Sequence, residues 1–91
     1  MAEPRLTRRA RTELEALPGD LRDAVLEALS AIGADPEGAG KPLLGRLRGL
    51  WSARVGSYRV IYSIEGTEAV PSVVVRAIRH RAVAYRPRER P

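Results

Sequence analysis

Arg54 and Arg59 are the residues whose type and spacing best suit anion chemistry, and they flank a Gly56-Ser57 sequence. A glycine in the first position favours a two-residue type II′ hairpin turn, because it reaches positive φ without strain. In that register Arg54 faces Arg59 on one side of the ribbon. No acid lies between Arg46 and Ile64 to offset the repulsion. Two guanidinium groups can hold one phosphate between them, and the alternative is that both simply extend into water.

A second cationic group, Arg79-His80-Arg81, ends the last predicted strand and precedes Tyr85. His80 is the single histidine, so it is the candidate acid or base that titrates near neutral pH, although a lone histidine at a strand end is more often a surface residue. Arg81 and Tyr85 are four residues apart, so one helical turn would place them on one face. There Tyr85 could stack on a nucleic-acid base; the alternative is that it closes the end of the core.

The net charge of +5 is distributed unevenly along the chain. Residues 1–40 hold five arginines and eight acids, whereas residues 41–91 hold eleven lysines and arginines and three acids. The second half is therefore the basic half, which indicates a polyanionic partner such as RNA, DNA or an acidic protein segment. A solvated basic surface without a partner is the alternative.

Composition excludes several classes of site. The 91 residues suffice for one domain, 1–91, whose last residues, 87–91, we expect to form a flexible tail. Without cysteine there is no disulfide, thiolate nucleophile or sulfur-bound zinc, and one histidine makes no metal cluster, so we expect no metal and no cofactor. No apolar run approaches the ~18 residues of a membrane span and no signal sequence is evident, so we expect a cytoplasmic protein without membrane contact.

Apolar spacing of three and four residues predicts two helices in the first half. The first covers about residues 8–17 with Thr7 as its cap, and a turn at Pro18-Gly19-Asp20 separates it from the second. The second helix covers about residues 20–32 and is expected to stop at Gly33. The two form a helical hairpin with one apolar stripe.

The second half changes to a period of two after a predicted loop over residues 34–49. Strands are expected over residues 50–55, 58–64 and 72–79, with residues 3–6 as a further edge strand. The order β-α-α-β-β-β indicates an α+β domain whose helical hairpin packs on a mostly antiparallel sheet. The face expected to pack on the helices carries Trp51, Ala53, Val55, Tyr58, Val60, Tyr62 and Ile64, and the other face carries Ser52, Arg54, Arg59, Ile61 and Ser63.

Taken together, these segments resemble toxins of the RelE/ParE superfamily. The resemblance is carried by the strand-turn-strand of residues 50–62, the Val-rich strand, the His80–Tyr85 segment and the preceding loop from Lys41 to Gly49, and it covers about residues 4–87. It implies a RelE-like fold and the toxin of a type II toxin–antitoxin module. A RelE-type toxin is an mRNA interferase: on the ribosome it cuts mRNA by attack of a 2′-hydroxyl on the adjacent phosphate, without metal. A RelB-like antitoxin neutralises it, and operator DNA is bound only through the complex.

The resemblance also implies roles for individual residues. Arg54, Arg59, Arg81 and Tyr85 match the family's catalytic positions: Arg59 would stabilise the phosphorane, Arg81 would stabilise it or protonate the leaving oxygen, and Tyr85 would stack on a base. Ser52 stands where one well-known family site has a lysine, and Arg54 is a poor base, so the general base is unassigned. The remaining cations expected to contact RNA or the ribosome are Lys41, Arg46, Arg48, Arg76 and Arg79.

Two other functions stay open at this point. A ParE-like toxin of the same fold inhibits DNA gyrase and cuts nothing; such relatives tend to have a longer helical hairpin, so the compact helices favour the RelE type. A noncatalytic nucleic-acid-binding domain would need only the basic half.

Overall fold

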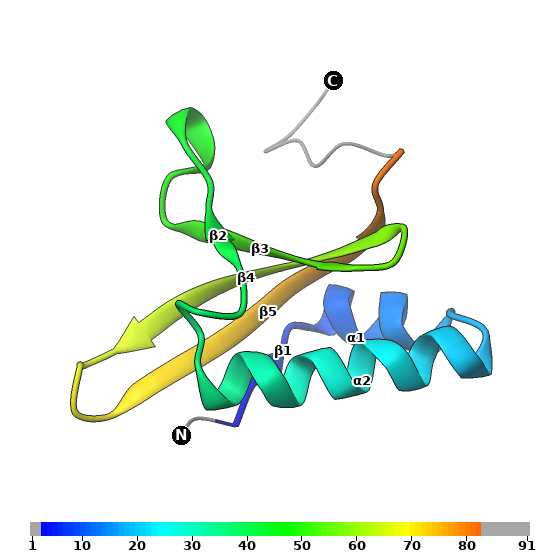
Figure 1. Cartoon of the computed structure of the whole chain (residues 1–91), viewed down its shortest axis with the longest axis horizontal. Coiled ribbons are helices and arrows are strands. Elements are labelled where there is room, and N and C mark those ends of the chain that lie inside the picture. Colours follow the sequence, from blue (N-terminus) through cyan, green and yellow to red (C-terminus); the bar gives the residue numbers. More distant parts are fainter. Residues whose placement is uncertain (1–2, 83–91) are drawn as a thin grey trace.

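The chain folds around a five-stranded sheet with the strand order β1-β5-β4-β3-β2 (Figure 1). The computed structural model describes residues 3–82, so Tyr85 and the predicted tail at 87–91 lie outside the described residues. The strands are β1 (Arg5–Leu6), β2 (Lys41–Pro42), β3 (Leu50–Val55), β4 (Tyr58–Gly66) and β5 (Pro71–His80). β1 runs parallel to β5 and the other pairs are antiparallel, which confirms the expected α+β architecture and its mostly antiparallel sheet.

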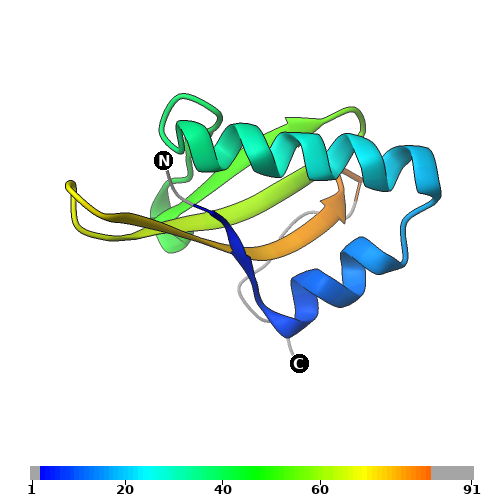
Figure 2. The ribbon, with the colours of Figure 1, turned by 90° about the horizontal axis from the view of Figure 1, so that it is seen from below.

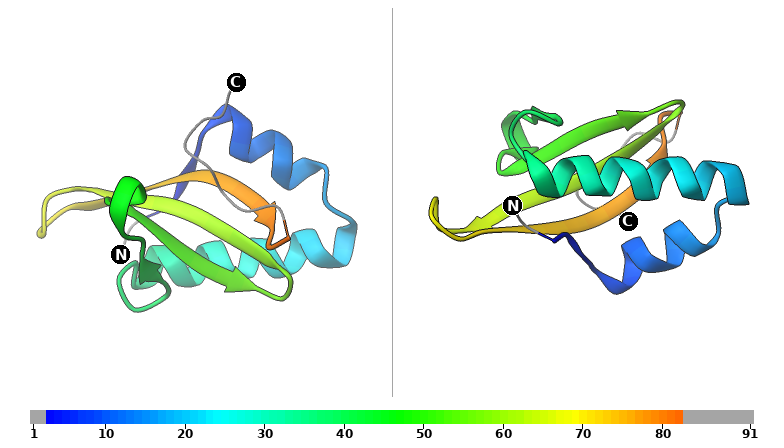
Figure 3. Two further views of the ribbon diagram at one scale, coloured as in Figure 1. Left: turned by 90° about the horizontal axis from the view of Figure 1, so that it is seen from above. Right: turned by 60° about the horizontal axis from the view of Figure 1, so that its bottom comes forward.

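Helices α1 (Arg8–Glu15) and α2 (Gly19–Ala34) lie together on one side of the sheet (Figures 2 and 3). Thr7 caps α1 as predicted, its hydroxyl accepting a hydrogen bond from the Ala10 amide at 3.1 Å. The predicted stop of α2 at Gly33 is wrong. Gly33 is buried within the helix, which ends one residue later at Ala34; Asp35 is its C-cap, and the next residue, Pro36, has no amide proton to continue it. Within residues 3–82 no helix is long and apolar enough to cross a membrane.

The β3–β4 hairpin has the predicted register. Arg54 lies opposite Arg59, and Gly56 adopts a φ of 59° while Ser57 does not have a positive φ, as a type II′ turn requires. Alternation then sends Ala53, Val60 and Tyr62 into the core with the helices, as expected. The face that carries Arg54 and Arg59 we call the arginine face. Ile61 and Ser63 on that face are also buried, which the alternation did not predict.

The predicted loop over residues 34–49 contains two short elements. β2 pairs with β3 at the sheet edge, where Pro42 is tolerated, and a 3-10 turn, η1 (Gly45–Leu47), follows it. The loop before β2 passes so close to the sheet that a Cβ on Gly40 would collide with the Tyr62 hydroxyl and the Ser52 carbonyl. A glycine is therefore required at position 40 to bring β2 against β3.

Tyr62 joins this loop to the core. Its ring is fully buried and stacks beside Trp51 at a centroid distance of 6.4 Å, while its hydroxyl donates a 2.7 Å hydrogen bond to the Pro36 carbonyl. Burial, with Asp35 nearby, raises the pKa of this phenol, so the hydroxyl stays protonated and can donate. One side chain thus fixes the chain between the end of α2 and the start of β2.

Replacing Tyr62 with phenylalanine should destabilise the protein. The ring stays in place but the Pro36 carbonyl loses its donor, which costs about 1–2 kcal/mol. In a domain of this size that lowers Tm by roughly 4–16 °C, measurable by thermal unfolding. The matched control is Tyr58→Phe, since the half-buried Tyr58 hydroxyl makes no hydrogen bond within residues 3–82. Equal Tm values for the two variants would contradict this role for the Tyr62 hydroxyl.

Glu13 anchors α1 to the sheet where the edge of β5 would otherwise be open. β1 pairs only with Val74 and Val75, so the Ile78 amide beyond it has no strand partner there. The Glu13 carboxylate takes the place of a strand carbonyl and accepts from that amide at 2.8 Å. Its second oxygen lies 3.6 Å from Nε of Arg79 and 3.5 Å from Nε of Arg9. A single carboxylate therefore closes the edge of the sheet and balances two guanidinium groups.

Glu13→Ala should lower the free energy of unfolding by about 1–3 kcal/mol, because the amide of the buried residue Ile78 loses its acceptor. Urea unfolding measures the loss. Glu15→Ala on the same helix is the control, since Glu15 is exposed and makes no ion pair within the described residues. A Glu13 variant as stable as the Glu15 variant would show that the edge needs no carboxylate.

Candidate functional site

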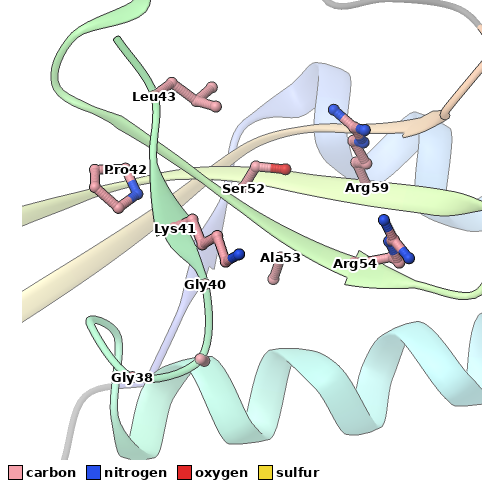
Figure 4. A pocket seen from close by; sticks show the side chains of 10 residues that line it. Gly38, Gly40, Lys41, Pro42, Leu43, Ser52, Ala53, Arg54 and Arg59 are labelled. Carbon is pink, nitrogen blue, oxygen red and sulfur yellow. The ribbon is translucent and has the colours of Figure 1, made fainter.

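Arg54 and Arg59 form a facing pair at one end of the arginine face. They are direct cross-strand partners in β3 and β4, both are exposed, and Figure 4 shows their guanidinium groups extending from neighbouring strands. Arg79 continues the row on β5, opposite Arg59. The arrangement brings three guanidinium-bearing positions into one line across three strands, and guanidinium groups are well suited to bind a phosphate.

Lys41 adds a further cation from β2. It lies directly opposite Ser52, whose other neighbour is Ile61, so its side chain belongs to the same face as Arg54 and Arg59. These residues border an open hollow of about 720 Å³. Figure 4 shows Lys41 extending toward β3 across this hollow. The hollow is lined by Gly38, Ala39, Gly40, Lys41, Pro42, Leu43, Ser52, Ala53, Arg54 and Arg59, and we call it the cationic groove.

The cations of the groove differ from their neighbours in having no acidic partner. Within residues 3–82, no carboxylate lies within 4.0 Å of the charged nitrogens of Lys41, Arg54 or Arg59. Arg79, by contrast, lies beside Glu13. Like charges gathered without counter-charge make a site that an anion would stabilise.

Arg76 is separated from the groove by a β-bulge. The register of β5 shifts between the partners of Ile61 and Tyr62, so Arg76 has no opposite residue. Its guanidinium donates to the Ser63 hydroxyl at 3.1 Å and to Glu65 at 2.8 Å. The hydrogen bonds from Ser63 and Arg76 lower the pKa of the Glu65 carboxyl. Arg76, expected from the sequence to contact RNA, is thus already engaged by an ion pair within the sheet.

Arg46 and Arg48 lie in and directly after η1, both exposed, on the turn that rises from the sheet on the side away from the helices (Figure 1). They do not line the cationic groove. Their position leaves them accessible to a large partner that approaches the arginine face.

Arg81 lies at the same end of the sheet as the facing arginines. Its amide donates to the Ser57 carbonyl at 2.7 Å, which holds the chain after β5 against the β3–β4 turn, and its side chain is exposed. The structure thus brings Arg81 near the turn that connects Arg54 and Arg59. Tyr85, which was expected to complete this group, lies outside the described residues.

His80 is on the other face of the sheet. It pairs with Tyr58, and the two rings meet edge to face at 5.2 Å, on the side that packs toward the helices. Its Nδ1 accepts from the Ala82 amide at 3.0 Å. The expectation that His80 could act as acid or base beside the arginines is not supported by this placement, because adjacent residues of a strand point to opposite faces.

Comparison with known proteins places the chain in a family. A model of the ParE toxin of the type II toxin–antitoxin system parDE matches residues 5–85. Toxin RelG of Mycobacterium tuberculosis is 40% identical over 83 residues, 90% of this chain and 93% of that protein. Toxin RelE of the same organism is 35% identical over 82 residues, 89% of this chain and 82% of that protein.

Solved structures show the same fold. The toxin–antitoxin complex RelBE2 from M. tuberculosis contains a chain that superposes with a TM-score of 0.76 at 36% identity, covering 85% of this chain and 94% of that one. A chain of the intact E. coli RelBE toxin–antitoxin complex gives a TM-score of 0.69 at 21% identity, covering 91% and 96%. The chain described here therefore belongs to the RelE/ParE superfamily and is a toxin of a type II toxin–antitoxin system.

Proposed function

We propose that this toxin is a ribosome-dependent mRNA endonuclease. The observation that carries the proposal is the cationic groove, where Lys41, Arg54 and Arg59 meet without a described acidic partner. A single-stranded RNA backbone brings the negative charge that such a groove lacks. The resemblance of the chain to RelE-type toxins supplies the reaction: a ribose 2′-hydroxyl attacks the adjacent phosphate and the 5′-oxygen leaves.

Arg54 and Arg59 suit the electrostatic part of this reaction. Charge grows on the phosphoryl oxygens as the fifth bond to phosphorus forms, and two arginines at opposite positions of neighbouring strands can both donate to that charge. Arg81, tied to the Ser57 carbonyl at the same end of the sheet, would add a third donor. Tyr85 would stack on a base, as proposed from the resemblance.

A RelB-like antitoxin is the expected partner. The structural neighbours include toxin–antitoxin complexes of RelE with RelB, one of them 36% identical to this chain. By charge complementarity, an acidic antitoxin segment is suited to cover the cationic groove and keep RNA out. Operator DNA would then be bound through the complex, and the toxin would act in the cytoplasm, where ribosomes translate.

A ParE-like gyrase inhibitor is the second candidate. The observation that favours it is the match of residues 5–85 to the ParE toxin model. Such a toxin would use the same fold and a basic surface for protein binding, without cutting RNA. Only an activity measurement separates the two functions, because the fold serves both.

Induction of the toxin in bacteria without its antitoxin tests the choice. We expect growth to stop and mRNA to be cut at codons occupied by ribosomes, detected by mapping 5′ ends across the transcriptome. The control is the same strain with the antitoxin co-expressed, in which both effects should disappear. Intact mRNA together with altered DNA supercoiling would replace the nuclease with the gyrase inhibitor.

Arg59→Ala and Arg81→Ala should each slow cleavage of ribosome-bound mRNA by about 10²–10³-fold, since each removes a donor to the developing charge. The rate is measured with purified toxin on programmed ribosomes. Arg11→Ala is the matched control, an exposed arginine on α1 outside the groove. Thermal unfolding verifies that all three variants remain folded. Folded Arg59 and Arg81 variants with wild-type rates would remove both residues from the site.

A further inference from the structure

The cationic groove has arginines to hold a phosphate but, among them, no group that readily moves a proton. Breaking the bond between phosphorus and the 5′-oxygen leaves an alkoxide, which needs a proton to depart easily. The guanidinium group stays protonated up to a pH of about 12 or above, so Arg54 and Arg59 are poor proton donors and poor bases. A reaction of this kind therefore calls for one more residue at the groove.

Lys41 is the one lysine in the chain, and the structure places it in the groove wall. It is the direct partner of Ser52, and Arg54 is the next residue of β3 on the same face. Such diagonal neighbours lie about 7–8 Å apart at the backbone, within reach of long side chains. An ammonium group, unlike a guanidinium, combines a positive charge with a proton that it can give to an alkoxide.

The backbone under Lys41 is held firmly. The preceding Gly40 fits against the Ser52 carbonyl and the Tyr62 hydroxyl with no room for a Cβ, and Tyr62 in turn is hydrogen-bonded to Pro36. After β2, the Leu43 amide donates to the Leu50 carbonyl at 2.8 Å. The position of the Lys41 Cα relative to β3 is thus set from both sides, which a proton donor requires.

Other titratable groups of residues 3–82 are turned away or engaged elsewhere. His80 and Tyr58 lie on the helix side of the sheet, and the Tyr62 hydroxyl donates to Pro36. Glu13 and Glu65 each sit beside guanidinium groups, and the Asp35 carboxylate accepts a 3.1 Å hydrogen bond from the Gly38 amide. Among the described residues that line the groove, Lys41 is the one whose side chain readily gives up a proton.

We propose that Lys41 is the catalytic proton donor to the departing 5′-oxygen, an inference that rests on the proposed nuclease function. The 2′-oxygen forms a bond to phosphorus while the bond to the 5′-oxygen breaks, giving a 2′,3′-cyclic phosphate and a 5′-hydroxyl. Solvent water accepts the proton of the attacking 2′-hydroxyl. The Lys41 ammonium gives its proton to the 5′-oxygen, and the resulting amine regains a proton from water, so no charge or atom is left over.

The test uses two substrates on programmed ribosomes, one with the natural 5′-oxygen and one with sulfur in its place. A thiolate leaves without protonation, so the sulfur substrate needs no proton donor. Lys41→Arg keeps the positive charge but is a poor donor, and we expect it to cut the oxygen substrate about 100-fold more slowly than wild type and the sulfur substrate within about threefold of wild type, in single-turnover experiments. Lys41→Met serves as a second variant that also removes the charge.

The possible outcomes are distinct. If wild-type toxin cuts neither substrate, the nuclease function itself fails. If wild type cuts both and Lys41→Arg is as fast on the oxygen substrate, Lys41 is not the donor, although the nuclease stands. If Lys41→Arg is equally slow on both substrates, Lys41 acts through the position of its side chain and not as the proton donor, and the proposal is overturned. Rescue by sulfur in Arg81→Ala and not in Lys41→Arg would assign the proton to Arg81 and overturn the proposal.

Discussion

The facing of Arg54 and Arg59 across the β3–β4 hairpin is the constraint on which the site depends. The turn determines this register, because Gly56 adopts the positive φ that a two-residue turn needs. The remaining residue pairs between β3 and β4 are then set by the turn. A slip of β4 by one residue would send Arg59 toward the core and turn Val60 out to water. The burial of Val60 and Ala53 under the helices therefore keeps two like charges opposite each other, an arrangement that the two arginines would not favour alone.

The fold divides its cations into two groups by what lies beside them. Arg76 pairs with Glu65, and Arg79 lies beside Glu13, the residue that closes the edge of β5. Those ion pairs hold strands and helix in place. The cations of the groove have no such partner within residues 3–82, so their mutual repulsion is relieved only by an anion from outside. The positions of Glu13 and Glu65 therefore distinguish the cations of the groove from Arg76 and Arg79.

Much of this arrangement can be predicted from the local sequence. The remaining parts are determined by contacts between residues that are distant in the sequence. The turn and the alternation around it were enough to predict that Arg54 faces Arg59. β2 could not be predicted, because two residues carry no periodicity and their pairing depends on Gly40 fitting against Tyr62. Lys41 consequently looked like a loop residue, and its place opposite Ser52 appeared only with the fold.

Sequence proximity also misled where a strand separates neighbours. Arg79, His80 and Arg81 are consecutive, yet pairing with β4 turns His80 toward Tyr58 and leaves Arg79 opposite Arg59. Alternation alone predicts that Arg79 and His80 lie on opposite faces of the sheet. It does not predict which of them shares a face with Arg54 and Arg59, because that depends on the register between β4 and β5. The bulge at Arg76 resets this register within β5. The face on which a cation lies is thus decided by the pairings of its strand, which explains why a basic run in the sequence and a basic site in the structure contain different residues.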